Sequence, residues 1–342
     1  MSNAIMLNTQ EAKVLVEDCM NANLVPLLKG SPGTGKSSIM HVIAKERNLK
    51  LIDIRLAQID DVELNGFPDL SGDKATYKQF DIFPTEGDEV PVGYDGWLLF
   101  FDELTSADKT KQGAAYKIIL DRMVGQEKLN SKAYCVAAGN LLTDKAVVNN
   151  MSTAMQSRLI HLNMGVDKDK WIDWAIKSNI DNRVISFIEY QPSSLHKFDP
   201  NHQEDTFACQ RTWEFCSRLI KPMAKIDGSK LALLAGTISQ GVAREFKAFC
   251  ELSEQLVSFE EIMKDPTNAL VPADAGSRYA TVGMLADHVN VDNASKAMIY
   301  IERLPAEFQL CTIRRIYQTN KKIITVTEIR EWLKANAKEW LN

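Results

Sequence analysis

The chain has 342 residues, of which 45% are hydrophobic and 25% charged, and its formal net charge is −5 at pH 7. These values are typical of a globular protein with one large or two smaller domains, and they exclude an overall basic field that would draw the chain onto nucleic acid. We expect no signal peptide, because the N-terminal segment lacks a basic stretch followed by an apolar one, and no membrane span, because no apolar run reaches about 18 residues. The six cysteines are scattered without a C-x-x-C pair, which predicts a reduced, cytoplasmic chain.

Strand-like and helix-like segments alternate in the first half of the chain. We expect helices at 9–21, 36–47 and 108–123, and strands at 24–29, 49–55, 97–101, 133–138 and 158–162. The first helix would be capped by Thr9. The run W-L-L-F-F at 97–101 is wholly apolar, as in a strand buried on both faces. The alternation predicts a parallel sheet with helices on both sides, and the Pro- and Gly-rich stretch 66–93 predicts a long loop or a small hairpin.

Helical spacing of apolar residues dominates after about residue 165. We therefore divide the chain into an α/β domain at 1–165, a helical domain at 166–260 and a smaller helical region at 278–342. The last helix would run over 325–341, with a capping box formed by Thr325 and Glu328.

A glycine-rich turn joins the strand at 24–29 to the helix at 36–47. Its sequence, G-S-P-G-T-G-K-S-S, contains the phosphate-loop pattern G-x-x-x-x-G-K-[ST]. Glycines allow several backbone N–H groups to point at one anion, and the following helix adds its positive end. A chance glycine turn is the alternative, but the flanking strand and helix favour a nucleotide phosphate. The site would comprise Gly30, Ser31, Pro32, Gly33, Thr34, Gly35, Lys36, Ser37 and Ser38, with Lys36 reaching the outer phosphates and Ser37 binding Mg²⁺.

Two acids, Asp102 and Glu103, end the apolar strand at 97–101. Acids at this end of a parallel strand lie where such sheets bind ligands. Asp102 would hold the magnesium ion with Ser37, and Glu103 would orient and polarise the attacking water. An alternative is that the pair caps a helix; agreement with the phosphate loop favours the catalytic interpretation.

The segment from Asp102 to Arg122, D-E-L-T-S-A-D-K-T-K-Q-G-A-A-Y-K-I-I-L-D-R, resembles the Walker B segment and following helix of MoxR-type AAA+ ATPases. The ungapped matches are Asp102, Glu103, Ala107, Gln112, Ala114 and Arg122. The chain departs from the family at Thr105 and Ser106, where Asn and Arg are usual. The resemblance covers about residues 5–255. It implies the AAA+ fold, a P-loop parallel sheet flanked by helices, with a helical lid at 166–260 and a small helical C-terminal region. It also implies that the stretch from 66 to about 84 is the family's helix-2 insert, a candidate surface for a substrate.

Three further site residues follow from the resemblance. Asn140 occupies the place of sensor 1, which helps to position the attacking water. Arg158 corresponds to the arginine finger that reaches the γ-phosphate of the neighbouring subunit, with Arg122 as the second candidate. Arg211 corresponds to sensor 2 at the start of a lid helix, although the family's proline is absent. The alternatives are a turn asparagine and ordinary surface arginines.

The resemblance implies a homo-oligomeric, hexameric ring that uses ATP and Mg²⁺ to remodel or assemble a protein client, which in this family can carry a von Willebrand factor A domain. The main alternative is a DNA-linked AAA+ motor or loader. The negative charge and the lack of a DNA-binding module disfavour a nucleic-acid partner. A degenerate nucleotide-binding module is disfavoured by intact Lys36, Asp102 and Glu103. A small-molecule kinase would share the phosphate loop but would not need Asn140 or the two arginines.

Overall fold

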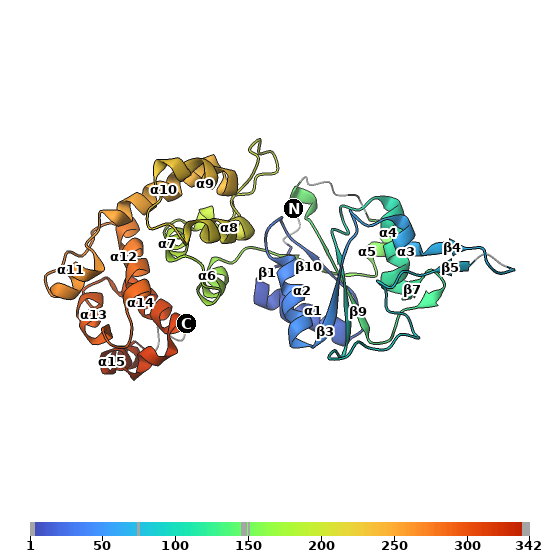
Figure 1. The fold of residues 1–342 in the computed structure, drawn as a ribbon, viewed down its shortest axis with the longest axis horizontal. Helices are drawn as coiled ribbons and strands as arrows, with labels where there is room; N and C mark the ends of the chain where they lie inside the picture. Colours follow the sequence, from blue (N-terminus) through green and yellow to red (C-terminus); the bar gives the residue numbers. More distant parts are fainter. Residues whose placement is uncertain (1–3, 74–75, 145–148, 150, 337–342) are drawn as a thin grey trace. The chain divides into compact units, whose positions relative to one another are not determined.

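The computed structural model describes residues 4–73, 76–144, 149 and 151–336. The chain divides into an α/β unit, which comprises the described residues up to 167 together with 199–202, and a helical unit, which comprises the other described residues from 168 onward (Figure 1). Among the helices of the described residues, none combines the length and the apolar character that a membrane crossing needs.

The α/β unit is built on a sheet of parallel strands in the order β1-β10-β2-β9-β6-β3. The bounds are β1 Met6–Leu7, β2 Pro26–Lys29, β3 Leu49–Arg55, β6 Gly96–Asp102, β9 Ala133–Gly139 and β10 Ile160–Met164. Helices cover both faces of this sheet, and a helical region follows it. The fold class predicted from the sequence is therefore confirmed.

Side chains that alternate along each strand supply two separate cores. On β6, Leu98 and Phe100 pack in the cluster that contains α1 (Thr9–Asn21) and α2 (Lys36–Glu46). Leu99 and Phe101 pack in the cluster of the opposite face. That face is covered by α3 (Asp61–Asn65), α4 (Lys109–Tyr116), the π-helical turn Lys117–Asp121 and α5 (Thr153–Gln156). Every strand residue from Gly96 to Phe101 is buried, which explains the uninterrupted apolar run.

Two local predictions in this unit were wrong. The cap of α1 is Asn8, not Thr9, because the Asn8 side chain accepts from the N–H groups of Gln10 and Glu11. The helix predicted over 108–123 ends earlier. After α4 and the π turn, Arg122 adopts a left-handed backbone (φ 54°), and the chain enters the hairpin of β7 (Met123–Val124) and β8 (Glu127–Lys128). The stretch 66–93 contains a second hairpin, β4 (Phe67–Asp69) with β5 (Thr76–Lys78).

The helical unit contains two hydrophobic cores. The first is formed by α6 to α10, and the second by α11 to α15, with α12 contributing to both. The bounds are α6 Lys168–Lys177, α7 Asn182–Tyr190, α8 Gln210–Ile220, α9 Leu231–Ile238, α10 Gln240–Glu254, α11 Phe259–Lys264, α12 Ala275–His288, α13 Ala294–Ile301, α14 Ala306–Thr319 and α15 Thr327–Ala335. A buried ion pair between Arg315 on α14 and Glu189 on α7 links helices of the two cores.

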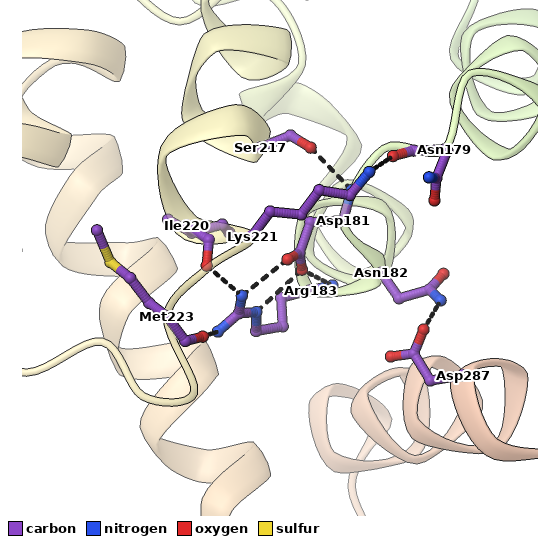
Figure 2. Close-up of polar contacts among 9 residues, drawn as sticks. All are labelled: Asn179, Asp181, Asn182, Arg183, Ser217, Ile220, Lys221, Met223 and Asp287. Carbon is purple, nitrogen blue, oxygen red and sulfur yellow. Dashed lines mark hydrogen bonds and ion pairs between the residues drawn. The ribbon is translucent and has the colours of Figure 1, made fainter.

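Arg183 fixes the C-terminal end of α8 (Figure 2). Its guanidinium donates to the main-chain oxygens of Ile220 (2.8 Å) and Met223 (2.9 Å) and pairs with Asp181 at 2.7 Å. The Asp181 carboxylate also caps α7 through the N–H of Arg183 (2.9 Å). A cation at the last carbonyls of a helix satisfies acceptors that have no partner within the helix. The network therefore anchors α8, the helix whose second residue is Arg211.

The predicted capping box of the last helix was wrong. The α15 helix begins at Thr327 after Val326, and no described side chain caps it. Thr325 instead donates to the main-chain oxygen of Lys322 (2.8 Å), and Glu328 accepts from Ser295 (2.9 Å). The rest of the predicted span, from residue 337, lies outside the described residues.

Candidate nucleotide site

The carboxyl ends of three adjacent strands bring the sequence motifs to one edge of the sheet. The phosphate loop follows β2, Asp102 ends β6, and Asn140 follows β9. Because β2 pairs with β9 and β9 with β6, all in parallel, these segments must meet at the same edge. A hydrogen bond from Gly30 N to Gly139 O (3.2 Å) joins the first and third of them.

The phosphate loop has the backbone that its glycines predict. Gly33 (φ 79°) and Gly35 (φ 88°) are left-handed, a region that side chains disfavour. At Gly30 a Cβ atom would lie 3.0 Å from the main-chain oxygen of Met164 and 3.1 Å from Thr34 Oγ1. Among the residues that the structure describes, no side chain caps the N-terminus of α2 after Gly35. Its first N–H groups are therefore available to an anion.

Lys36 lies in the centre of the loop and is only 9% exposed. Its ammonium donates to the main-chain oxygens of Gly30 (2.6 Å) and Ser31 (3.1 Å) and to Asn140 Oδ1 (3.4 Å). A buried lysine needs such acceptors. The same ammonium can exchange them for phosphate oxygens, and it already links the loop to the residue after β9.

Ser37 and Asp102 form the part of the edge that suits a magnesium ion. Ser37 Oγ donates to Asp102 Oδ2 at 3.0 Å, and Asp102 Oδ1 accepts from the N–H of Glu103 at 2.8 Å. A hydroxyl and a carboxylate are the hard oxygen donors that Mg²⁺ prefers, and Mg²⁺ usually takes only one or two protein carboxylates beside water and phosphate. The two side chains fit the ion.

Glu103 has a left-handed backbone (φ 59°), which is uncommon for a residue with a side chain and costs about 1–3 kcal/mol. The turn takes the chain out of β6 and is held by the bond from Leu104 N to Ala138 O (2.9 Å). The alternative that the two acids cap a helix is wrong, because α4 begins at Lys109 and is capped by Asp108. The half-buried Glu103 side chain is left for another role.

Thr105, for which no role was predicted, holds Asn140 in place. Its side chain is 3% exposed, and Thr105 Oγ1 accepts from the N–H of Asn140 at 2.9 Å. The main-chain oxygen of Thr105 accepts from Asn149 N at 2.7 Å. The only sign in the sequence of a special role for this residue was that Thr105 stands where the family usually has Asn.

Asp144 is a second residue that sequence reasoning missed. It is 6% exposed, and its carboxylate accepts from Ser31 Oγ at 3.0 Å and from Leu141 N at 3.2 Å. No motif marks it, because its partner Ser31 is 113 residues away in the sequence.

The three candidate arginines have different environments. Arg158, after α5, is exposed and lies over the ring of Tyr116, with its guanidinium carbon 5.4 Å from the ring centroid. Arg122 is half-buried and donates to the main-chain oxygens of Asn130 (2.7 Å) and Ala133 (2.8 Å). Arg211 belongs to the helical unit, where it is the second residue of α8 and is exposed.

Residues 26–161 match the family model described as "ATPase family associated with various cellular activities (AAA)". The match spans less than half of the chain but contains every site residue of the α/β unit discussed above. The α/β unit therefore contains an AAA ATPase domain.

Comparison with other proteins adds little to this assignment. No curated protein sequence matches significantly. Similar solved structures include NtrX from Brucella abortus in complex with ADP (13% identity, 95% of this chain and 67% of that chain, TM-score 0.35) and the same protein in complex with ATP (11% identity, 98% and 69%, TM-score 0.35). A Cytophaga hutchinsonii protein provisionally described as an ATPase is also similar (13% identity, 98% and 90%, TM-score 0.35). At these TM-scores the likenesses carry no argument.

Proposed function

We propose that this chain is a cytoplasmic, Mg-ATP-dependent AAA+ ATPase of MoxR type that works as a hexameric ring and remodels or assembles a protein client. The observation that carries the proposal is the edge of the sheet where Lys36, the Ser37–Asp102 pair and Asn140 meet. The MoxR subtype is supported by the ungapped motif from Asp102 to Arg122.

Each side chain of the edge has a separate task in hydrolysis. Lys36 and the N–H groups of the loop bind the phosphates, and Ser37 with Asp102 holds the magnesium ion, which neutralises charge on the outer phosphates when bound. Glu103 orients the attacking water and accepts its proton, and Asn140 orients the same water. Arg211 would act from the lid as sensor 2.

The arginine finger is assigned to Arg158. A finger must stabilise charge on a phosphate held by another subunit, so its guanidinium must be accessible. Arg158 is exposed, whereas the guanidinium of Arg122 is bound to two main-chain oxygens of its own unit.

The client surface is assigned to the β4–β5 hairpin, which corresponds to the helix-2 insert. Its large apolar side chains are unusually exposed: Phe67 is 62%, Leu70 77% and Tyr77 46% exposed. Exposed apolar side chains grouped on one element are typical of interaction sites. A von Willebrand factor A domain in the client rests on family resemblance alone.

The function is tested by mixing two inactive variants. Glu103→Gln should abolish hydrolysis within a subunit, and Arg158→Ala should abolish it in the neighbour. Each variant alone should be inactive, and the mixture should regain activity, because some interfaces then combine an intact Glu103 with an intact Arg158. Arg330→Ala, an exposed arginine of α15, is the matched control and should keep wild-type activity.

The outcomes separate the parts of the proposal. Activity of Arg158→Ala equal to that of the wild type at all protein concentrations would refute the finger. Wild-type activity per chain that does not rise with protein concentration would refute the ring. Strong stimulation of hydrolysis by DNA would instead favour the DNA-linked motor or loader.

A further inference from the structure

We propose that Asp144 is a positioning residue that couples the phosphate loop to the sensor residue Asn140 through the Ser31 hydroxyl. The inference rests on the proposed ATPase function and adds a residue that the phosphate-loop, Walker B and sensor motifs do not contain.

The contacts of Asp144 close a ring of hydrogen bonds across the site. Asp144 Oδ1 accepts from Ser31 Oγ (3.0 Å), and the main-chain oxygen of Ser31 accepts from Lys36 Nζ (3.1 Å). Lys36 Nζ also donates to Asn140 Oδ1 (3.4 Å). Asn140 is covalently joined to Leu141, whose N–H donates to Asp144 Oδ2 (3.2 Å). The Asp144 carboxylate therefore closes a ring that also contains the direct hydrogen bond between the Lys36 ammonium and the Asn140 amide.

Further bonds make each side of this ring rigid. On the loop side, the main-chain oxygen of Ser31 also accepts from Thr34 Oγ1 (2.8 Å). On the sensor side, the N–H of Asn140 is bound by the buried Thr105 hydroxyl (2.9 Å). Asp144 joins the phosphate loop to the segment after β9, and each of these segments has hydrogen bonds of its own. Removing the Asp144 carboxylate should therefore change the distance between the two segments without unfolding either one.

The charge of Asp144 argues for this positioning role and against a role in binding phosphate. A carboxylate beside a phosphate loop repels the ligand. Asp144 is 6% exposed, and each of its oxygens already accepts a hydrogen bond. Its contribution is the alignment of Lys36, which contacts the transferring phosphate, with Asn140, which orients water. Small errors in such alignment lower the rate of reaction more than they lower affinity.

Paired substitutions test the inference. Asp144→Ala removes both acceptors, and Ser31→Ala removes only the hydroxyl donor. Asp144→Asn is the conservative control: its amide oxygen can accept from Leu141 N, while its NH₂ donates to Ser31 Oγ, because a serine hydroxyl both donates and accepts. Steady-state ATP hydrolysis gives kcat and KM, binding of a fluorescent ATP analogue gives Kd, and thermal unfolding confirms that each variant is folded.

We expect Asp144→Ala and Ser31→Ala each to lower kcat by about tenfold or more while Kd changes less than about threefold. The double variant should be no slower than the slower single variant, because both remove the same link. Asp144→Asn should stay within about threefold of the wild type, since it keeps both hydrogen bonds.

Three results would overturn the inference. They are wild-type kcat in Asp144→Ala, multiplicative losses in the double variant, and a loss in Asp144→Asn as large as that in Asp144→Ala. If Asp144→Ala does not fold, Ser31→Ala and Asp144→Asn still decide the question. A wild-type chain that binds the analogue but does not hydrolyse ATP would refute the proposed function together with this inference, whereas an active wild type with an unaffected Asp144→Ala refutes the inference alone.

Discussion

Gly139, the last residue of β9, provides the sharpest test of how closely the segments of the site are packed. A Cβ atom at this position would lie 2.5 Å from both Cγ2 and Oγ1 of Thr105 and 3.0 Å from its Cβ. Rotation of the Thr105 side chain cannot remove the clash, because the Cβ of Thr105 does not move with χ1. In Gly139→Ala the backbone after β9 or after β6 must therefore shift.

The cost has two parts. Overpacking of a filled core costs about 1–3 kcal/mol. The shift also breaks the bond between Thr105 Oγ1 and Asn140 N, 2.9 Å long, and a buried donor without a partner costs about 1–3 kcal/mol. We expect Gly139→Ala to lower the free energy of unfolding by about 2–6 kcal/mol. This corresponds to a fall in Tm of at least about 4 °C for a unit of this size.

Urea denaturation followed by circular dichroism measures the change, and Gly113→Ala is the matched control. Gly113 lies in α4, where a Cβ would meet no atom within 4 Å, and alanine in a helix is about 0.5–1 kcal/mol more favourable than glycine. The control should be at least as stable as the wild type. Adding Thr105→Ser to Gly139→Ala removes one clashing methyl and should restore part of the loss. A Gly139→Ala variant within about 0.5 kcal/mol of the wild type would refute the reasoning, since that is the range of neutral surface changes.

Three other predictions concern separate parts of the chain. Arg315 is 1% exposed and pairs with Glu189, so Arg315→Met leaves the Glu189 charge in the core without its partner. The substitution should lower the free energy of unfolding, measured by urea titration, by about 3–5 kcal/mol, and adding Glu189→Met should recover most of the loss. An Arg315→Met variant as stable as the wild type would contradict this. Removal of Mg²⁺ with EDTA should abolish ATP hydrolysis, and Ser37→Ala should lower kcat by more than about tenfold; activity that persists in EDTA would exclude the magnesium site. Burial raises the pKa of Cys135 to about 12, and the residue is only 4% exposed. This thiol should therefore stay protonated, react slowly with DTNB at pH 8 and react rapidly only in denaturant. Rapid labelling of Cys135 in the native chain would contradict this.

The sequence predicted the fold correctly where the local pattern of apolar and polar residues matches the burial of those residues in the folded chain. The run at 97–101 reads as a strand buried on both faces, and β6 is such a strand. The pattern failed at 117–123, where K-I-I-L-D-R-M continues the helical spacing of apolar residues. There the helix widens into a π turn, and Arg122 takes a left-handed backbone. The guanidinium of Arg122 binds carbonyls 8 and 11 residues further along the chain, and no local pattern encodes these contacts.

The same distinction explains which site residues were missed. Lys36, Ser37 and Asp102 belong to motifs with fixed spacing, so a role could be proposed for each of them from its neighbours in the sequence. The hydrogen bond from Asn140 to Thr105 spans 35 residues of the sequence, and the one from Ser31 to Asp144 spans 113. The role of Thr105 and Asp144 is to hold other residues, and this requires only a donor or acceptor at a particular point in space. Residues of this kind can be identified only when the strand order shows which segments of the chain lie side by side.

Interaction energies also rank the two finger candidates, which sequence could not separate. To reach a neighbouring subunit, Arg122 would have to give up two hydrogen bonds to main-chain oxygens, and hydrogen bonds from a charged group contribute about 1.5–3 kcal/mol each. Arg158 would give up a contact with the ring of Tyr116, and an exposed cation–π contact contributes only about 0.5–1 kcal/mol. The difference of at least about 2 kcal/mol corresponds to more than a tenfold difference in the population of the extended side chain. An arginine that serves another subunit must be held loosely enough to leave its own, and among these two only Arg158 meets that condition.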